Sequence, residues 1–277
     1  MSEIYYENSL GKRIYFDRKP YRMLLDTTLF DYSWKYSTSG MNKLRVSSFQ
    51  KQMTTPQISV VISASTIEEG ARYKEEMLGI LDADIMLKTP GKFYVGDCYL
   101  RCYFIGSTKE RYVKRLSAKV TFDILAENGN WICEKAVSFS KITSDAYVAD
   151  GLDYTHEYPY DYANSLASRR IINDNYATSD FEMIIYGSCQ NPQISIGTHT
   201  YSVSAKLITG EYMVINSSTK KIYKVKNNGE RVNLYHCQGR EFYIFEKIPS
   251  GTLAVAWTGG FGFDIKLLQE RSEPKWT

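Results

Sequence analysis

The sequence predicts a mainly β protein of two domains, and three observations lead to that prediction. The chain has 277 residues, whereas a typical domain has roughly 100–200. Alternating apolar and polar residues recur along most of it, and a single segment has helical spacing. Turn signals rich in Gly, Asn and Pro separate the alternating segments at short intervals. Because no segment shows the pattern of a βαβ crossover, the sequence does not favour a doubly wound nucleotide-binding fold.

The first half predicts strands on both sides of one helix. Ser65 and Glu68 have the spacing of a capping box, so the helix should begin there and end near Ala83. Its expected apolar face consists of residues 67, 71, 78 and 81, with Lys74 as the exception. Glu127–Asn130 predicts a turn. The strands expected in this half are 13–17, 57–63, 93–95, 98–105 and 116–125.

The second half predicts a β-sandwich, because seven or eight short strands follow one another at regular intervals. Asn227–Gly229 is a strong hairpin signal, since Asn and Gly tolerate a positive φ. Gly259–Gly262 lacks a following helix that could hold phosphate, so a hairpin turn is predicted there. The expected strands are 181–186, 193–196, 199–203, 211–215, 221–225, 241–245, 251–257 and 261–267.

The two domains are predicted at residues 1–140 and 141–277. Residues 141–178 are expected to form an irregular junction, because the stretch 153–162 is polar and aromatic without clean periodicity.

The cysteines and histidines do not suggest a metal site or a disulfide framework. The five cysteines (98, 102, 133, 189 and 237) form no CxxC pair, so we predict free thiols in a reducing cytoplasm. Cys98 and Cys102 should lie on one face of a strand. His156, His199 and His236 are scattered, so no metal-binding residue is predicted.

Motifs for catalysis are missing from the sequence. It has no GxSxG elbow, no P-loop and no HExxH. His236 and Cys237 are adjacent, and on a strand they would point to opposite faces rather than form a nucleophile pair. No acidic pair stands out as the carboxylates of a glycosidase. We therefore predict no enzyme, no catalytic residue and no cofactor, and a cell-wall hydrolase is kept only as a third hypothesis.

Charge and composition favour a protein that binds other proteins. The net charge of +3 gives no case for nucleic acid or an anionic membrane as the main partner. No signal peptide and no apolar run of about 20 residues is found, so we expect synthesis in a cytoplasm without a membrane anchor. The 23 tyrosines are many, and Tyr favours both strands and protein interfaces.

The order of segments resembles the distal tail proteins of siphophages. In the second half the resemblance rests on a hydrophobic strand followed by Gly, then Asn-Pro, then Gly-Glu before another strand. The C-terminal segment with Arg and Trp also resembles that family. In the first half, the resemblance rests on Gly40 with the basic polar strand after it, the Glu-rich helix and the strand that ends at Leu125. The matching segments are 56–60, 181–187, 191–196, 210–216, 220–225, 228–229, 232–233, 248–251 and 270–276.

This resemblance implies a structural hub at the virion tail tip, made in the host bacterial cytoplasm. The N-terminal domain would be a tail-tube-like β-barrel or split barrel with one helix, and the C-terminal domain a galectin-like sandwich. Six copies would form a ring with an open channel through which DNA passes. The implied partners are the major tail-tube protein, a tail-associated fibre or lysin protein, and a receptor-binding protein.

An alternative is a carbohydrate-binding module whose sandwich reads host saccharides. Trp257, Tyr223, Tyr243 or Trp131 could stack on sugar rings, although aromatic residues in strands more often fill the sheets.

Overall fold

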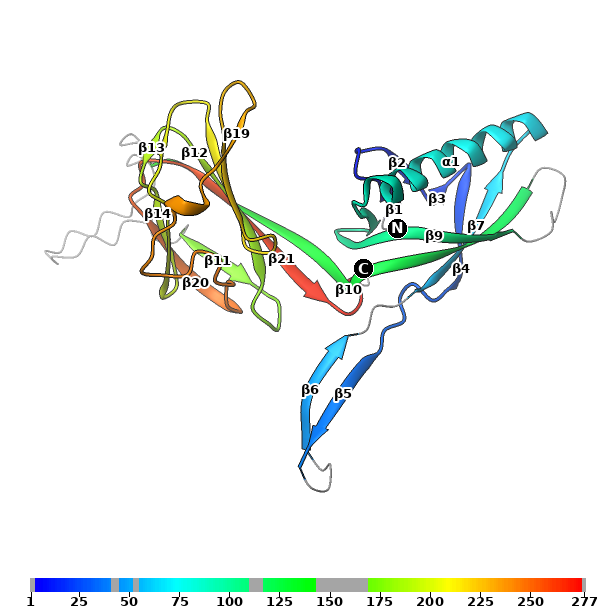
Figure 1. The fold of residues 1–277 in the computed structure, drawn as a ribbon, viewed down its shortest axis with the longest axis horizontal. Coiled ribbons are helices and arrows are strands. Elements are labelled where there is room, and N and C mark those ends of the chain that lie inside the picture. The colour runs from blue at the N-terminus through cyan, green and yellow to red at the C-terminus, as the bar shows by residue number, and fades with distance from the viewer. Residues whose placement is uncertain (1–2, 41–44, 52–54, 110–116, 143–168, 276–277) are drawn as a thin grey trace, which may run out of the picture. The chain divides into compact units, whose positions relative to one another are not determined.

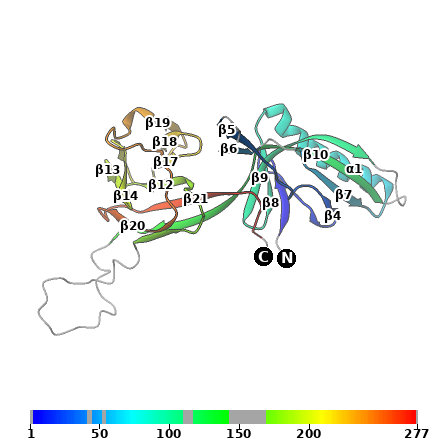
Figure 2. The same cartoon turned by 90° about the horizontal axis from the view of Figure 1, so that it is seen from below.

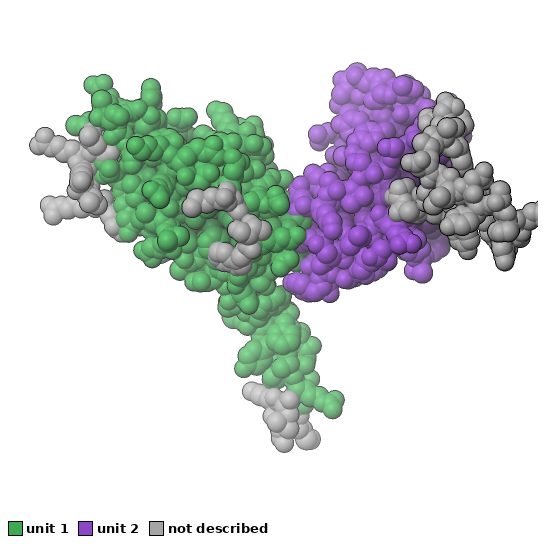
Figure 3. Space-filling model, turned by 180° about the vertical axis from the view of Figure 1, so that it is seen from behind, with its two compact units in different colours: residues 1–133, 270–277 green, residues 134–269 purple. Residues whose placement is uncertain are grey.

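The chain folds into two compact units, as seen in a computed structural model that describes residues 3–40, 45–51, 55–109, 117–142 and 169–275. Unit 1 consists of residues 1–133 and 270–277, and unit 2 of residues 134–269 (Figure 3). The described residues are mainly β-strand with one α-helix, which confirms the predicted fold class (Figure 1). The boundary between the compact units lies at 133/134, whereas the domain division was predicted at 140/141. Residues 143–168 of the predicted junction lie outside the described residues.

Unit 1 is a curled sheet with one helix. Its strands pair antiparallel in the order β2-β1-β8-β9-β10-β7-β4-β3. Because β3 follows β2 directly in the chain, this path returns to its start. The elements are β1 (Ile4–Glu7), β2 (Arg13–Tyr15), β3 (Asp17–Arg18), β4 (Tyr21–Thr27), β5 (Trp34–Ser39), β6 (Arg45–Lys51), β7 (Gln57–Ser63), α1 (Ile67–Leu87), β8 (Gly91–Val95), β9 (Cys98–Lys109) and β10 (Ser117–Phe139).

The core of unit 1 lies inside this sheet and under α1. The alternation of β9 and β10 places every second side chain inward, as expected for strands with one buried face. Aromatic rings contribute much of the packing: Tyr6, Phe93 and Phe122 surround Phe104, with ring centroids between 4.9 and 6.5 Å apart. The sheet is therefore anchored by large apolar side chains rather than by charges.

Helix α1 begins and ends later than predicted, and it buries a different face. The cap is Thr66, whose hydroxyl accepts from the Glu69 amide, while the Glu69 carboxylate accepts from the Ser65 amide at 2.7 Å. The box is shifted by one residue, because Ser-Thr and Glu-Glu offer two registers with the same spacing. The buried residues are Met77, Ile80, Leu81 and Asp84.

Asp84 is a buried carboxylate within this helix. It accepts hydrogen bonds from the Tyr6 hydroxyl and from the Ser9 amide, the latter at 2.8 Å. Burial, more than the neighbouring Asp84, raises the pKa of Tyr6. At Gly91 a Cβ would lie 2.2 Å from the Tyr6 hydroxyl oxygen, so a side chain there would displace this pair.

Strand β10 does not turn at Glu127–Asn130, which corrects the prediction. It continues through this segment, and its register against β9 shifts between Ala126 and Trp131. Gly129 has a φ of 62°, so Asn-Gly is accommodated as a strand irregularity. The reason is that β9 offers pairing partners on both sides of the irregularity, a long-range effect that a local turn signal does not contain.

Unit 2 is a sandwich of two antiparallel sheets. In one sheet β12 lies between β17 and β21, and β18 and β19 follow β17; the other has the order β11-β20-β14-β15. Figure 2 shows these strands from below. The elements are β11 (Arg170–Asn173), β12 (Asp180–Tyr186), β13 (Cys189–Gln190), β14 (Gln193–Ile196), β15 (His199–Ser202), β16 (Lys206–Leu207), β17 (Tyr212–Asn216), β18 (Lys221–Val225), β19 (Arg231–Asn233), the 3-10 helix η3 (Tyr235–Cys237), β20 (Gly251–Trp257) and β21 (Phe263–Arg271).

Both sheets of unit 2 contribute to one apolar core, as the sandwich prediction requires. Met183 and Phe263 come from the first sheet, and Ile194 and Val255 from the second. Alternate residues of each strand face this core, which is the period expected for strands with one buried side.

Two segments of unit 2 next to β20 differ from the prediction. Residues 241–245 form turns rather than a strand, although Ile244 and Phe245 are buried. Gly259–Gly262 is not a hairpin turn, because β20 pairs with β11 and β14 whereas β21 pairs with β12. The segment crosses from one sheet to the other, and apolar alternation alone does not say which sheet a strand joins.

Candidate interaction surfaces

The described residues include exposed apolar surfaces and hollows. Among these residues, no three His, Cys, Asp or Glu side chains are grouped in a way that could hold a metal ion. No helix in the described part of the chain is long and apolar enough to cross a membrane. His156 lies outside the described residues.

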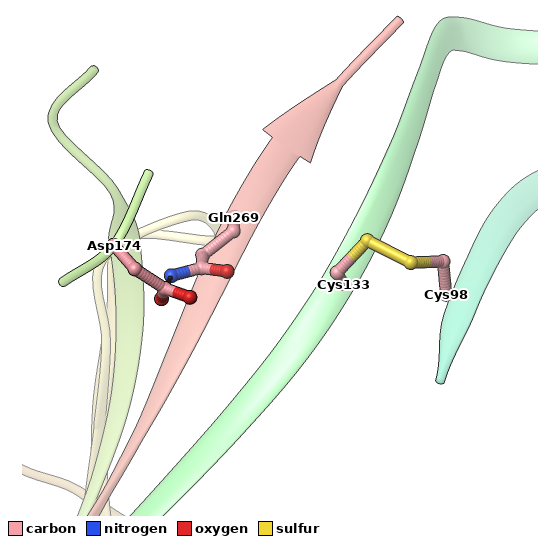
Figure 4. Close-up of a disulfide and its surroundings, with 4 residues drawn as sticks. All are labelled: Cys98, Cys133, Asp174 and Gln269. Atoms are coloured by element: carbon pink, nitrogen blue, oxygen red, sulfur yellow. Dashed lines mark hydrogen bonds between the residues drawn. A yellow bond between two sulfur atoms is a disulfide. The ribbon is translucent and has the colours of Figure 1, made fainter. Parts of the chain in front are cut away.

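Cys98 and Cys133 form a disulfide, so the prediction of five free thiols is wrong for these two (Figure 4). They face each other in the register of β9 and β10, with their Cα atoms 4.0 Å apart. The two cysteines are separated by 35 positions in the sequence, so local spacing could not predict this pairing. Cys102, Cys189 and Cys237 are free, and burial raises the pKa of the Cys102 thiol.

The two described histidines lie on different elements of unit 2. His199 lies on β15, and its Nε2 is 2.9 Å from the carbonyl oxygen of Tyr243. His236 and Cys237 lie in the 3-10 helix η3, not on a strand as predicted. The argument that strand geometry separates them therefore does not apply.

The hairpin β5–β6 extends from unit 1 and buries none of its residues (Figures 1 and 3). One of its faces is apolar: Tyr36 pairs with Phe49, and Thr38 pairs with Val46. Tyr36 and Phe49 are 66% and 64% exposed, which is unusual for paired aromatic side chains. A two-stranded hairpin is at best marginally stable by itself. An exposed apolar face of this kind is typical of a surface that binds another protein.

The opposite face of the hairpin is polar and basic. Lys35, Ser37 and Ser39 on β5 pair with Gln50, Ser48 and Arg45 on β6. The hairpin strands contain three basic residues and no acidic one. The sequence shows the alternation of β5 plainly, but the prediction included only a basic strand after Gly40. The exposure of both faces could not be seen without the fold.

A groove of about 900 Å³ runs along α1 beside β7 and the start of β10. Ile67, Ala71, Lys74 and Leu78 line it, so most of the helix face predicted for the core faces this groove instead. Ile67 is 71% exposed. The helix carries a second apolar stripe through Met77 and Ile80, and that stripe takes the core position. Residues 67–87 contain six acidic side chains against two basic ones, opposite in sign to the hairpin.

Three of the four aromatic residues predicted for saccharide binding are unsuited to it. Trp131 is 2% exposed and stacks on Phe30 in the core of unit 1. Trp257 is half-buried, and its Nε1 donates to the Phe261 carbonyl at 2.9 Å. Tyr223 is half-buried on β18.

Tyr243 is the remaining candidate, and its side chain is 54% exposed. It lies in the turn segment before β20, beside other exposed aromatic residues.

Three solved structures with a similar fold come from phage baseplates and a phage hub adsorption apparatus. No protein-family model and no curated protein sequence matches the chain. A chain of the phage P2 baseplate in its activated conformation with Ca matches at a TM-score of 0.65 and 12% identity, with 99% of each chain covered. The p2 baseplate with Sr gives 0.63 and 14%, again with 99% of each.

A third similar structure is the SPP1 Dit protein, described as a paradigm of the hub adsorption apparatus in phages that infect Gram-positive bacteria. It matches at a TM-score of 0.56 and 10% identity, over 98% of this chain and 99% of that one. At these identities the likeness concerns the fold. The two-unit, mainly β chain described here has, from end to end, the fold of phage baseplate and hub proteins.

Proposed function

We propose that this chain is the distal tail protein of a siphophage, a structural hub that joins the tail tube to the tail-tip apparatus. The observation that carries the proposal is the fold likeness over 98–99% of the chain to baseplate and hub proteins. Both units are covered, so the likeness is not limited to a common sandwich domain. The protein would act at the virion tail tip.

Self-assembly into a ring is the central part of this proposal. A subunit that closes a ring by rotation needs two different surfaces that fit each other. Unit 1 has two such surfaces, the apolar face of the β5–β6 hairpin and the apolar groove along α1. The hairpin strands carry a net positive charge and the helix a net negative charge. Opposite charge favours contact between the hairpin of one copy and the groove of the next over contact between two like surfaces.

The remaining roles follow from the same proposal. Unit 1 would form the ring and stack on the last ring of the tail tube, and unit 2 would project outwards and hold receptor-binding proteins. The opposite side of the ring would meet a fibre or lysin protein, and DNA would pass through the channel without specific contacts. No enzymatic step is assigned to the chain.

Light scattering coupled to gel filtration tests the proposal on the purified full chain. We expect an oligomer of about six copies, and negative-stain images of rings with a central channel. A chain that stays monomeric alone should join a ring when the tail-tube protein is added. Monomers under both conditions would contradict the proposal.

A zymogram on Gram-positive cell walls separates the hub from the hydrolase hypothesis. We expect no clearing at the position of this chain. Clearing that disappears with an acidic-to-amide variant would instead favour an enzyme.

A further inference from the structure

A hollow on unit 2 lies beside the only predicted saccharide-stacking residue that the described structure leaves well exposed. Its volume is about 400 Å³, within the range of roughly 300–1,000 Å³ that small-ligand sites occupy. It is lined by Tyr235, His236, Gln238, Gly239, Arg240, Phe242 and Tyr243. Tyr235, Phe242 and Tyr243 are 42%, 44% and 54% exposed. These three aromatic residues lie within a span of nine residues and line the same hollow, whereas exposed rings on an ordinary surface are scattered.

The segment that carries these rings is held in place by the sandwich. The Tyr201 hydroxyl donates to the Glu246 carbonyl at 2.8 Å, and the Gly239 amide donates to the Ser202 carbonyl at 2.9 Å. Ile244 and Phe245, each 1% exposed, anchor its far end in the core. A site that is formed before its ligand arrives does not lose loop entropy on binding.

Gly239 shows how closely this segment approaches β15. A Cβ at this position would lie 2.1 Å from the Ser202 hydroxyl oxygen, so only glycine fits without a shift. The close approach keeps the neighbouring side chains of Gln238 and Arg240 at the hollow.

Each ring is supported from within the protein and open on its remaining surface. Tyr235 stacks on Phe245 at a centroid distance of 6.1 Å. Phe242 packs edge-on against His199 at 5.5 Å, and the Lys220 ammonium lies 5.4 Å from the centre of the Tyr243 ring. These contacts restrict the rings while leaving about half of each side chain to solvent.

We propose that this hollow binds the pyranose ring of a saccharide. A pyranose has a face of C–H groups that packs on an aromatic ring, and a rim of hydroxyls that both donate and accept hydrogen bonds. Phe242 and Tyr243 supply the aromatic surface. Gln238 supplies an amide that both donates and accepts, and Arg240 supplies donors in a planar fork. This mixture of aromatic and planar polar groups matches a sugar better than a purely apolar ligand.

The site goes beyond the hub function and does not depend on it. A hub protein can assemble through unit 1 whether or not unit 2 binds a sugar. If both hold, the hollow would give the tail tip a weak contact with host surface polysaccharide.

The test uses the full chain on an array of hexose, N-acetylhexosamine and uronic acid oligosaccharides, followed by titration calorimetry with the strongest ligand. Phe242→Ala and Tyr243→Ala should each weaken binding about tenfold, corresponding to about 1.4 kcal/mol. Gln238→Ala should also weaken it. Tyr176→Ala is the matched control, because Tyr176 is 76% exposed and does not line the hollow. It should leave the affinity unchanged.

A loss of binding in these variants can be distinguished from a loss of folding, because the four substituted side chains all reach solvent and their removal leaves the core intact. Circular dichroism and ring formation should be the same in each variant as in the parent chain. An array on which no oligosaccharide binds at millimolar concentration would overturn the proposal. So would binding that survives in Phe242→Ala combined with Tyr243→Ala. A variant that binds no sugar and also fails to form rings would assign the hollow to subunit contact, which overturns the proposal as well.

Discussion

Two antiparallel strand pairs of unit 1, β5–β6 and β9–β10, have similar local pairing and opposite environments. Both place aromatic side chains on one face of the strand pair. The face of β9–β10 packs into the core beneath α1, whereas no residue of β5–β6 is buried. The difference shows that an alternating sequence determines which side chains share a face of a strand pair. It does not determine which other part of the protein packs against that face. For β9–β10 the cover belongs to the same chain, and for β5–β6 we propose that it belongs to another copy.

The largest expected difference between the two strand pairs is in the free energy of unfolding when one tryptophan of each pair is replaced. Trp131→Ala removes a fully buried ring and should destabilise unit 1 by about 3–5 kcal/mol. Trp34→Ala is the matched change on the hairpin, where the side chain is 45% exposed, and should cost less than about 0.5 kcal/mol. Urea unfolding followed by circular dichroism measures both. Equal losses would mean that the hairpin is part of the folded core.

Loss of the disulfide should have the next largest effect. Cys98→Ala combined with Cys133→Ala opens a loop of 35 residues, and the chain-entropy estimate for such a loop is about 3–4 kcal/mol. The melting temperature should fall, and dithiothreitol should lower that of the parent chain by a similar amount. Cys237→Ala is the control, because Cys237 is a free thiol. A parent chain insensitive to dithiothreitol would contradict the role of the disulfide in stability.

Changes on the apolar face of the hairpin should affect assembly and not folding. Tyr36→Ser and Phe49→Ser each remove an exposed ring, and loss of a central interface side chain costs about 2 kcal/mol, or about thirtyfold in affinity. The urea midpoint should stay unchanged, while sedimentation velocity should show dissociation. Ser37→Ala with Ser48→Ala alters the polar face of the same hairpin and should leave assembly intact. The reverse pattern would place the contact on the polar face.

The smallest expected effect on stability concerns the carboxylate of Asp174 in unit 2. Asp174 accepts a hydrogen bond from the Gln269 amide at 2.7 Å (Figure 4). It also pairs with Lys135 at 3.0 Å. These contacts, the Gln269 hydrogen bond first, hold the pKa of Asp174 well below its usual 3.8. Because the folded pKa is depressed, the carboxylate stabilises the fold above about pH 4, and this contribution is lost as pH falls below that value.

Asp174→Asn measures this contribution. The side chain is 49% exposed, so solvent screening limits its effect to about 1 kcal/mol or less. The variant should melt slightly below the parent chain at pH 7, and the gap should narrow progressively as the pH falls below about 4. Asp97→Asn, at an exposed position of unit 1, is the control. A gap that is constant with pH would show that the carboxylate charge is not responsible.

Much of the β architecture was predictable from the sequence, because burial on one face of a strand imposes a period of two. β7, β14, β18 and β20 were predicted with the bounds that the structure has. The sandwich of unit 2 followed from the number and spacing of such strands. The surfaces were predicted poorly, since exposure depends on neighbours distant in the chain. Tyr36 and Phe49 of the hairpin were not singled out, and Trp131, a candidate for sugar stacking, is buried.

By itself, the sequence determined the fold class, the single helix and the strands whose alternation is unbroken, because these depend on residues close together in the chain. Only the tertiary structure decided which of two apolar stripes of α1 enters the core, that Cys98 meets Cys133, and that β10 continues through Glu127–Asn130. Each of these depends on a partner strand brought near by folding. The groove along α1 and the hollow at Tyr243 exist for the same reason, since a concave surface is made by residues that are neighbours only in three dimensions.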